Sequence, residues 1–282
     1  MAETINLLEK GAKTIATYFY KESLAAGRFS TEYDWAGVKT VVVLTPQTVE
    51  MNEYNRTAGS NRYGNPEEMK DTKQDLTLTQ DRSFALVIDK GNNADQGGLK
   101  AAGKMLRLQL AERAIPEMDK YIFKTLKEKA GTQVVAASAP TSADVCERIS
   151  AGTEALDDAE VPQDGRTLFV PASTYTALKL SNKLDSLEKV GTKALVKGQV
   201  GEYDGMTVIK VPKGRWPEGT HFIIAYKNSV TAPVKLNETK LHQDPPGISG
   251  NLLEGRQYYD CFVLDAKKEG VYAEATAFEA KE

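Results

Sequence analysis

Three glycines fall within eight residues, at Gly198, Gly201 and Gly205, and glycine-rich segments of this kind can bind phosphate groups. A phosphate loop lies between a strand and a helix, so that backbone N–H groups and the helix N-terminus face the anion. Here the glycines precede the alternating segment MTVIKVP at 206–212, which predicts a strand that ends in proline, and neither GxxxxGK[ST] nor GxGxxG occurs. We therefore interpret the glycines as part of a turn between strands, with Gly205 at positive φ.

Side chains that commonly carry catalysis or bind metals are sparse. His221 and His242 lie in no HExxH or HxxxH pattern, no cysteine is near them in sequence, and no GxSxG nucleophile motif is present. We interpret Glu67–Glu68 as a solvated pair, and the acidic residues at 157–160 as a solvated helix end with a weak cation site as the alternative. The sequence therefore predicts no catalytic residue, no cofactor and no metal site.

Composition limits the class of protein further. The 282 residues are 41% hydrophobic and 27% charged, with a net charge of −3, which is ordinary for one large or two smaller globular domains. A basic surface for tight nucleic-acid binding is not indicated. Residues 1–22 resemble neither a secretory signal nor a membrane-spanning helix. The two cysteines, Cys146 and Cys261, are too few for a disulfide framework and fit a reducing cytoplasm.

The first 36 residues combine a helical apolar pattern with an aromatic segment. Apolar residues at helical spacing are Ile5, Leu8, Ile15 and Tyr18. Phe29, Tyr33 and Trp35 follow without clear periodicity. Such a segment needs a surface on which to lie, and we expect neighbouring copies of the chain to order it.

Residues 37–90 predict two β segments around a long polar middle. The outgoing segment, 38–45, is rich in β-branched residues. In the return segment, 75–89, one alternating face carries Leu76, Leu78, Phe84, Leu86 and Ile88. A structureless stretch as long as 46–74 is unusual inside a compact domain. We therefore predict a hairpin that projects from the body.

A long helix is predicted over residues 95–131. Asp95 is its expected N-cap and Gly131 its stop, which gives roughly 50 Å at ~1.5 Å per residue. Pro116 removes one hydrogen bond, so a kink or break is expected at 112–116. The residues expected to face a sheet are Leu106, Leu110 and Met118.

The remaining chain alternates helices and strands and then becomes mainly β. Residues 132–227 predict an α/β unit with helices at 141–158, opened by a Thr141–Asp144 cap pattern, and 173–184. Its predicted strands are 166–171, 206–212 and 221–226. Strands at 234–239 and 255–276 follow, the second broken by a hairpin turn at Lys267–Gly270.

Four segments carry a resemblance to a known family: AERAIPEMDKYIFKTL at 111–126, RTLFVPASTYTAL at 166–178, GQVGEYDGMTVIKVP at 198–212 and GRQYYDCFVLDAKKEGVYA at 255–273. With the order of the predicted parts, they resemble the major capsid proteins of tailed bacteriophages. The resemblance covers essentially the whole chain, but none of its motifs is a catalytic signature. It implies an α+β fold with these parts: an N-terminal arm at 1–36, an extended hairpin loop at 37–90, a peripheral domain with a spine helix at 91–131, an axial domain at 132–227, and return strands of the peripheral domain at 228–282.

The resemblance also implies a function. It indicates a subunit that assembles with itself, in hexamers and pentamers, into an icosahedral head shell around double-stranded DNA, without sequence-specific DNA binding. It implies a portal protein at one vertex, no membrane partner, and a virion made in the host bacterial cytoplasm. Because the hairpin begins by residue 38, with no room before it for the long scaffolding segment of some members, a separate scaffolding protein is expected. Some members cross-link through a hairpin lysine; Lys70 and Lys73 lie in that region, but the sequence identifies no partner asparagine.

Two alternatives remain at this stage. One is an encapsulin-like protein compartment, and the other is an α/β enzyme with a lid-like hairpin. On the capsid reading, the residues expected to make contacts between subunits are Phe29, Tyr33, Trp35, Arg56, Arg62, Tyr63, Lys70 and Lys73.

Overall fold

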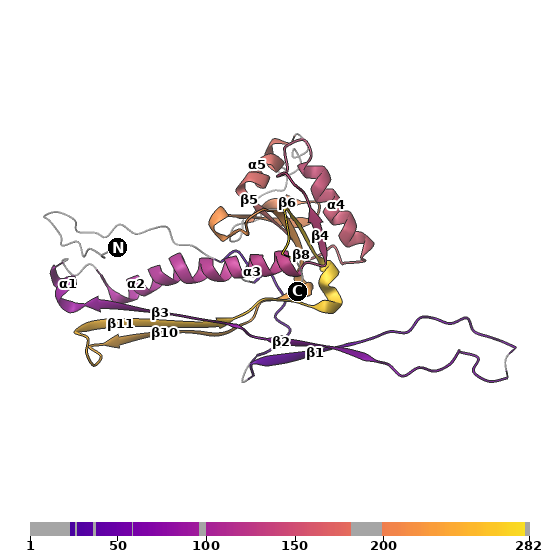
Figure 1. The fold of residues 1–282 in the computed structure, drawn as a ribbon, viewed down its shortest axis with the longest axis horizontal. Helices are drawn as coiled ribbons and strands as arrows, with labels where there is room; N and C mark the ends of the chain where they lie inside the picture. The colour runs from indigo at the N-terminus through magenta and orange to yellow at the C-terminus, as the bar shows by residue number, and fades with distance from the viewer. Residues whose placement is uncertain are drawn as a thin grey trace.

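The computed structural model describes residues 23–25, 27–35, 38–57, 59–95, 100–181 and 199–279. The fold is α+β and is drawn out along one axis, with an α/β lobe on one side of a long helix and a three-stranded sheet on the other (Figure 1). A hairpin projects far beyond both at one end. The mixed α+β fold class expected from the sequence is confirmed.

The lobe is built on a mixed six-stranded sheet. In spatial order its strands are β4 (Thr132–Val135), β13 (Val271–Ala275), β8 (Thr220–Tyr226), β5 (Arg166–Pro171), β7 (Met206–Val211) and β6 (Gln199–Tyr203). The pairs β4–β13 and β5–β7 are parallel and the others are antiparallel. Two helices, α4 (Val145–Asp158) and α5 (Ala172–Leu180), belong to the same lobe.

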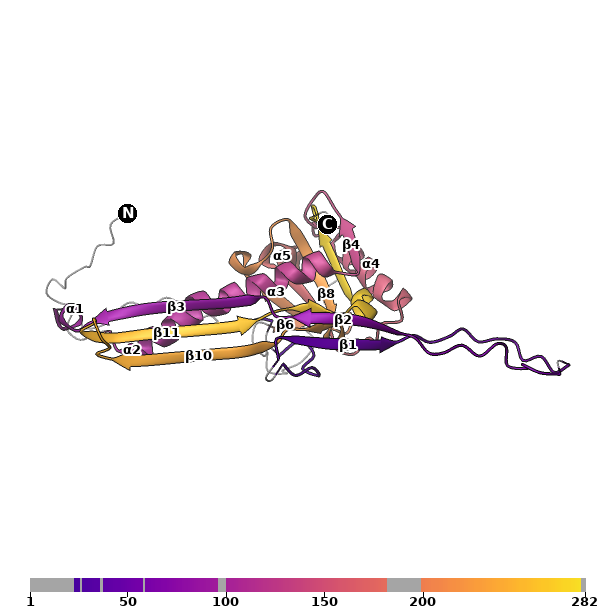
Figure 2. The ribbon, with the colours of Figure 1, turned by 60° about the horizontal axis from the view of Figure 1, so that its bottom comes forward.

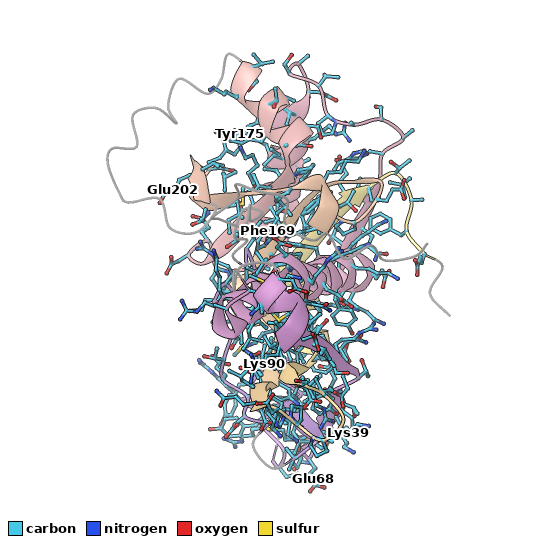
Figure 3. The ribbon with its side chains drawn as sticks, turned by 90° about the vertical axis from the view of Figure 1, so that its left-hand side faces the viewer. Lys39, Glu68, Lys90, Phe169, Tyr175 and Glu202 are labelled. Carbon is cyan, nitrogen blue, oxygen red and sulfur yellow. The ribbon has the colours of Figure 1, made fainter. Side chains whose placement is uncertain are left out.

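Both faces of this sheet are covered, because its strands alternate between two apolar clusters. On β5, Phe169 packs with the long helix, while its neighbours Leu168 and Val170 pack with α4 and α5. All six residues of β5 are buried, which is why RTLFVP has no polar alternation. Phe169 lies on the face of the sheet that packs against the long helix, below Tyr175 and Glu202 in the end-on view (Figure 3).

The long helix starts later than the sequence predicted, and it contains a π-helical turn. A short helix α1 (Lys90–Asp95) ends at Asp95, so the prediction of Asp95 as an N-cap is wrong. The spine helix, as we call residues 102–129, consists of α2 (Ala102–Gln109), the π-helical turn Leu110–Ala114 and α3 (Ile115–Lys129).

The π-helical turn lies where Pro116 was expected to disturb the helix. The Ile115 N–H donates to the Leu110 carbonyl, five residues earlier, directly before Pro116 at the start of α3. A proline lacks an N–H donor and crowds the preceding turn, and a wider turn relieves both effects. The disturbance expected at 112–116 therefore takes the form of a π turn within a continuous helix. Leu106, Leu110 and Met118 are only half-buried, whereas Ile122, Phe123 and Leu126 are buried.

The return segment of the hairpin divides between two sheets. Strands β1 (Thr40–Pro46) and β2 (Asp71–Thr77) form the antiparallel base of the hairpin. The chain then turns at residues 78–79, and β3 (Gln80–Asp89) pairs with β11 (Gly250–Tyr259), which pairs with β10 (Val234–Gln243). The single return strand predicted for 75–89 is therefore two strands.

The C-terminal strands also differ from the prediction. Lys267–Gly270 is not a hairpin turn but part of a 3-10 segment, Asp265–Gly270. The strands on its two sides do not pair: β12 (Phe262–Val263) pairs with β9 (Val230–Thr231), and β13 enters the six-stranded sheet. The last strand therefore belongs to the lobe rather than to the sheet beside the spine helix.

Candidate assembly surface

The glycine-rich segment is a turn, as predicted. Asp204 and Gly205 have φ values of 51° and 72° and connect the antiparallel strands β6 and β7. Two successive residues of positive φ are typical of the two-residue turns that fit the twist of a hairpin. No helix follows the glycines, so the segment lacks the geometry that binds phosphate. Gly198 lies outside the described residues.

The histidines and acidic clusters have structural partners. His221 is buried, with its Nε2 2.9 Å from the Ala136 carbonyl oxygen. His242 is exposed, with its Nε2 3.2 Å from a carboxylate oxygen of Glu254. Asp157 accepts a hydrogen bond from the buried Arg166 at 2.7 Å, so the acidic helix end is used for an ion pair. Among the described residues, no group of three or more histidine, cysteine or acidic side chains is placed to hold a metal ion.

The tip of the projecting hairpin has no core of its own, because none of its described residues from 47 to 70 is buried. Its tip has two arms, an outgoing arm of residues 47–57 and a return arm of residues 59–70. The arms are joined by backbone hydrogen bonds from Gln47 to Lys70, 2.7 Å, and from Asn55 to Arg62, 3.0 Å. Between these two points no backbone hydrogen bond links the described residues of the arms.

Apolar side chains are exposed along the hairpin. On β1, Val41 and Val43 face the body, whereas Val42 and Leu44 are 48% and 62% exposed on the opposite face. Further out, the exposed apolar residues are Val49, Met51, Tyr54, Tyr63 and Met69. Glu68 lies at the lower edge of the molecule in the end-on view (Figure 3). An apolar surface on an extended arm is typical of a segment that packs against another protein chain.

The aromatic residues of the N-terminal segment have partners within the chain. Phe29 packs on Phe169 with ring centroids 6.1 Å apart, and it is buried in the main core. The Trp35 ring stacks on the Phe262 ring, with the ring centroids 6.1 Å apart, and Trp35 also packs with Leu76 at the base of the hairpin. Because both rings are buried within the chain, the expectation that neighbouring copies order them is corrected for these two residues. Residues 1–22, with the predicted helical pattern, lie outside the described residues. Tyr33 is half-buried beside Trp35.

The other five predicted contact residues are exposed on the hairpin. Arg56, Arg62 and Tyr63 lie at the tip, and Lys70 and Lys73 lie toward its base. The Tyr63 ring packs edge-on against Tyr54 at 4.9 Å, and the Lys73 ammonium lies 3.1 Å from the Asp75 carboxylate. All five residues therefore lie on one projecting element. Their contact with a neighbouring subunit stays a prediction.

Sequence reasoning missed one group that links the hairpin to the body, the carboxylate of Asp260. One oxygen accepts hydrogen bonds from the Thr79 N–H and hydroxyl at 2.7 and 2.8 Å, and the other accepts from Tyr121 at 2.7 Å. Burial, and then this hydrogen bond, raises the pKa of Tyr121 to about 12. Thr79 follows β2 and Tyr121 belongs to α3, so Asp260 joins the hairpin to the spine helix. The residues beside it in the sequence, Tyr258, Tyr259 and Cys261, form no motif that indicates this role.

Comparison with known proteins finds similar folds but no match by sequence. No protein-family model and no curated protein matches the sequence. The structure of a chain from Mycobacterium phage Che8 superposes with a TM-score of 0.77 at 18% identity, covering 98% of this chain and 100% of that one. A chain of the bacteriophage PhiM1 mature capsid gives 0.72 at 14% identity over 95% and 91%. A chain of the capsid of Ralstonia phage GP4 gives 0.66 at 10% identity over the full length of both.

The chain has the phage capsid fold. The match extends over the hairpin, the spine helix and the α/β lobe together, because it covers nearly all of both chains. No helix in the described part of the chain has the length and apolar character needed to cross a membrane.

Proposed function

We propose that this chain is the structural, non-enzymatic subunit of an icosahedral head shell that encloses the double-stranded DNA of a tailed phage. The observation that carries the proposal is the full-length match to chains of phage capsids. The projecting hairpin supports it, because its exposed apolar residues are not covered by any described residue of the chain and are typical of a surface that packs against another chain.

We also propose how the parts of the shell subunit divide along the chain. We assign residues 1–36 to an N-terminal arm, 37–90 to the extended hairpin, 91–131 to a peripheral domain with the spine helix, and 132–227 to an axial domain. We assign residues 228–282 to the return of the chain, with β13 contributing to the lobe. The partners are further copies in hexamers and pentamers, a separate scaffolding protein, a portal protein at one vertex, and packaged DNA bound without sequence preference. The protein would be made in the host bacterial cytoplasm and reside in the virion.

Electron microscopy of the purified protein tests the proposal. We expect closed particles hundreds of ångströms across, formed alone or with a co-expressed scaffolding protein. A variant in which a short turn replaces residues 47–70 is the matched control, and it should remain folded but form no particles. A small defined oligomer as the only assembled species, with and without scaffolding protein, would contradict the proposal.

The charged hairpin tip gives a second test. We expect the double substitution Arg56→Glu and Arg62→Glu to weaken assembly while leaving the fold of the isolated subunit unchanged. Each exposed charge pair contributes only about 0–1 kcal/mol, but the contact recurs at every subunit of a shell. Circular dichroism reports the fold, and sedimentation across a salt series reports assembly.

Arg56→Lys with Arg62→Lys is the control for this pair, because it keeps the positive charge at both positions. Raising the salt concentration should weaken assembly of the wild type, since ions screen exposed charges. If the Glu variant assembles as well as the wild type at every salt concentration, the tip charges make no contact between subunits.

A further inference from the structure

A cavity of about 430 Å³ lies between the N-terminal segment and the body of the subunit. One wall is formed by residues 25–35, and the other by Met118 and Ile122 on the spine helix together with residues 231–235, which lead into β10. Figure 2 shows the N-terminal segment, in indigo, where the start of β10 meets the base of the hairpin. The volume falls in the range of roughly 300–1,000 Å³ that is typical of sites for small molecules.

The floor of the cavity is apolar. Phe29, Trp35 and Ile122 line it and are each no more than 5% exposed. The two buried polar residues of the lining bond to each other, because the Thr231 hydroxyl donates to the Ser30 carbonyl oxygen at 3.2 Å. The surface that the floor offers to a ligand is therefore mainly aromatic and aliphatic, which favours an apolar group.

The rim of the cavity is polar but carries no net charge. Asp34 and Lys235 are exposed there with opposite charges, and the Lys235 ammonium already donates to the Val38 carbonyl at 2.6 Å. The hydroxyls of Thr31 and of the half-buried Tyr33 make no hydrogen bond to any described residue. An anionic head group would meet Asp34 and a cationic one Lys235, whereas a neutral hydroxyl can bond to the free hydroxyls.

We propose that this cavity binds a neutral amphiphile, a molecule with a short apolar chain and a hydroxyl group. The chain lies on the floor, and the hydroxyl bonds to Thr31 or Tyr33 at the rim. Because the bound molecule touches both walls, it holds residues 25–35 against the spine helix, and it stabilises this docked arrangement by mass action. The site lies within one copy of the chain, so it goes beyond the shell function and does not depend on it.

Quenching of tryptophan fluorescence by ω-bromooctanol tests the site on the unassembled, full-length subunit. Bromine quenches an indole ring that it contacts. Trp35 lines the cavity, whereas Trp216, the other tryptophan of the chain, does not. We expect quenching of part of the fluorescence that saturates as the probe is added. Trp35→Phe, which keeps an aromatic ring in the wall, should abolish the saturable part.

Val234→Phe is the variant designed to fill the cavity. Val234 is 47% exposed at the rim, so a larger side chain there does not disturb the buried core. The half-saturation concentration of the probe should rise about tenfold, which corresponds to lost burial of about two methylene groups. Val87→Phe is the matched control, because Val87 is 55% exposed on β3 and lies outside the cavity, so this variant should bind like the wild type.

A second filling variant and a second measurement support the same test. Ala232→Leu changes the lining at another position and should weaken binding in the same direction. Hydrogen exchange in peptides that span residues 23–35 should slow when the probe is added, because the ligand joins this segment to the body. Slowing that is equal in Val234→Phe and the wild type would contradict the site.

Charged analogues of the probe test the class of ligand. We expect ω-bromooctanoate and ω-bromooctylamine to bind more weakly than the alcohol. Tighter binding of either one would overturn the assignment of a neutral ligand. Quenching that never saturates, or that is the same in the wild type, Val234→Phe and Ala232→Leu, would overturn the cavity as a binding site. Neither result bears on assembly, which electron microscopy tests separately.

Discussion

Replacing Asp119 with alanine is expected to cost the subunit about 3–5 kcal/mol of unfolding free energy, the range typical of breaking a buried ion pair from one side. Asp119 is fully buried on the spine helix, and its carboxylate accepts a hydrogen bond from Arg215 at 2.7 Å. It also accepts from the Ser23 hydroxyl at 2.6 Å and the Leu24 N–H at 3.0 Å. Alanine would leave the Arg215 guanidinium, which is 8% exposed, without this carboxylate.

Denaturant unfolding of the unassembled subunit measures this effect. Glu117→Ala, two residues earlier on the same helix, is the control, because Glu117 is 58% exposed and 3.7 Å from Arg82. An exposed pair contributes about 0–1 kcal/mol, so this variant should unfold close to the wild type. Asp119→Asn keeps one oxygen acceptor and should fall between the two. If Asp119→Ala is as stable as Glu117→Ala, the carboxylate does not hold the N-terminal segment to the helix.

The helices and strands were predictable from sequence where the local pattern and the packing agree. The strand RTLFVP was predicted with the bounds that β5 has, because apolar residues fill both faces of a strand that is covered on both sides. The β6–β7 turn was predictable because Asp-Gly commonly occupies positive φ. The projecting hairpin was predicted because the polar segment 46–74 is longer than the structureless loops usually found inside a compact domain.

The errors arise where distant segments decide the structure. The apolar residues Leu76, Leu78 and Phe84 to Ile88 keep one alternating register across 75–89, so only the pairing of β3 with β11 reveals the break at Leu78–Thr79. Lys267–Gly270 resembles a hairpin turn, but its flanking strands pair elsewhere. Phe29 and Trp35 have no local periodicity, and their partners Phe169 and Phe262 are more than a hundred residues away. For the candidate assembly surface, the sequence indicated the hairpin charges but gave no sign of the carboxylates that hold the hairpin and N-terminal segment in place.

Asp260→Ala is the other substitution with a large expected effect. The carboxylate is buried and accepts four hydrogen bonds, from the Thr79 N–H and hydroxyl, the Tyr121 hydroxyl and the Cys261 N–H. Hydrogen bonds to a charged group contribute about 1.5–3 kcal/mol each. Because these four share one acceptor, their contributions do not add, and we expect a total loss of about 3–5 kcal/mol.

The loss should be concentrated where the hairpin leaves the body. Thr79 lies between β2 and β3, so without Asp260 the turn between the two sheets loses its link to Tyr121 on the spine helix. Hydrogen exchange should therefore accelerate in peptides spanning residues 71–89 more than in β5 or β8, which lie in the lobe. Asp265→Ala is the control, since Asp265 is an exposed carboxylate near the hairpin base, and its exchange pattern should match the wild type.

An assembly assay then shows whether Asp260 sets the direction of the hairpin or only stabilises the subunit. A hairpin that leaves the body at a variable angle cannot meet its neighbour at a fixed position. We therefore expect Asp260→Ala to assemble poorly even at temperatures where the subunit stays folded. Asp119→Ala, with a similar loss of stability but an intact hairpin base, should assemble better under the same conditions. Equal assembly of the two variants at matched stability would mean that Asp260 stabilises the subunit without setting the direction of the hairpin.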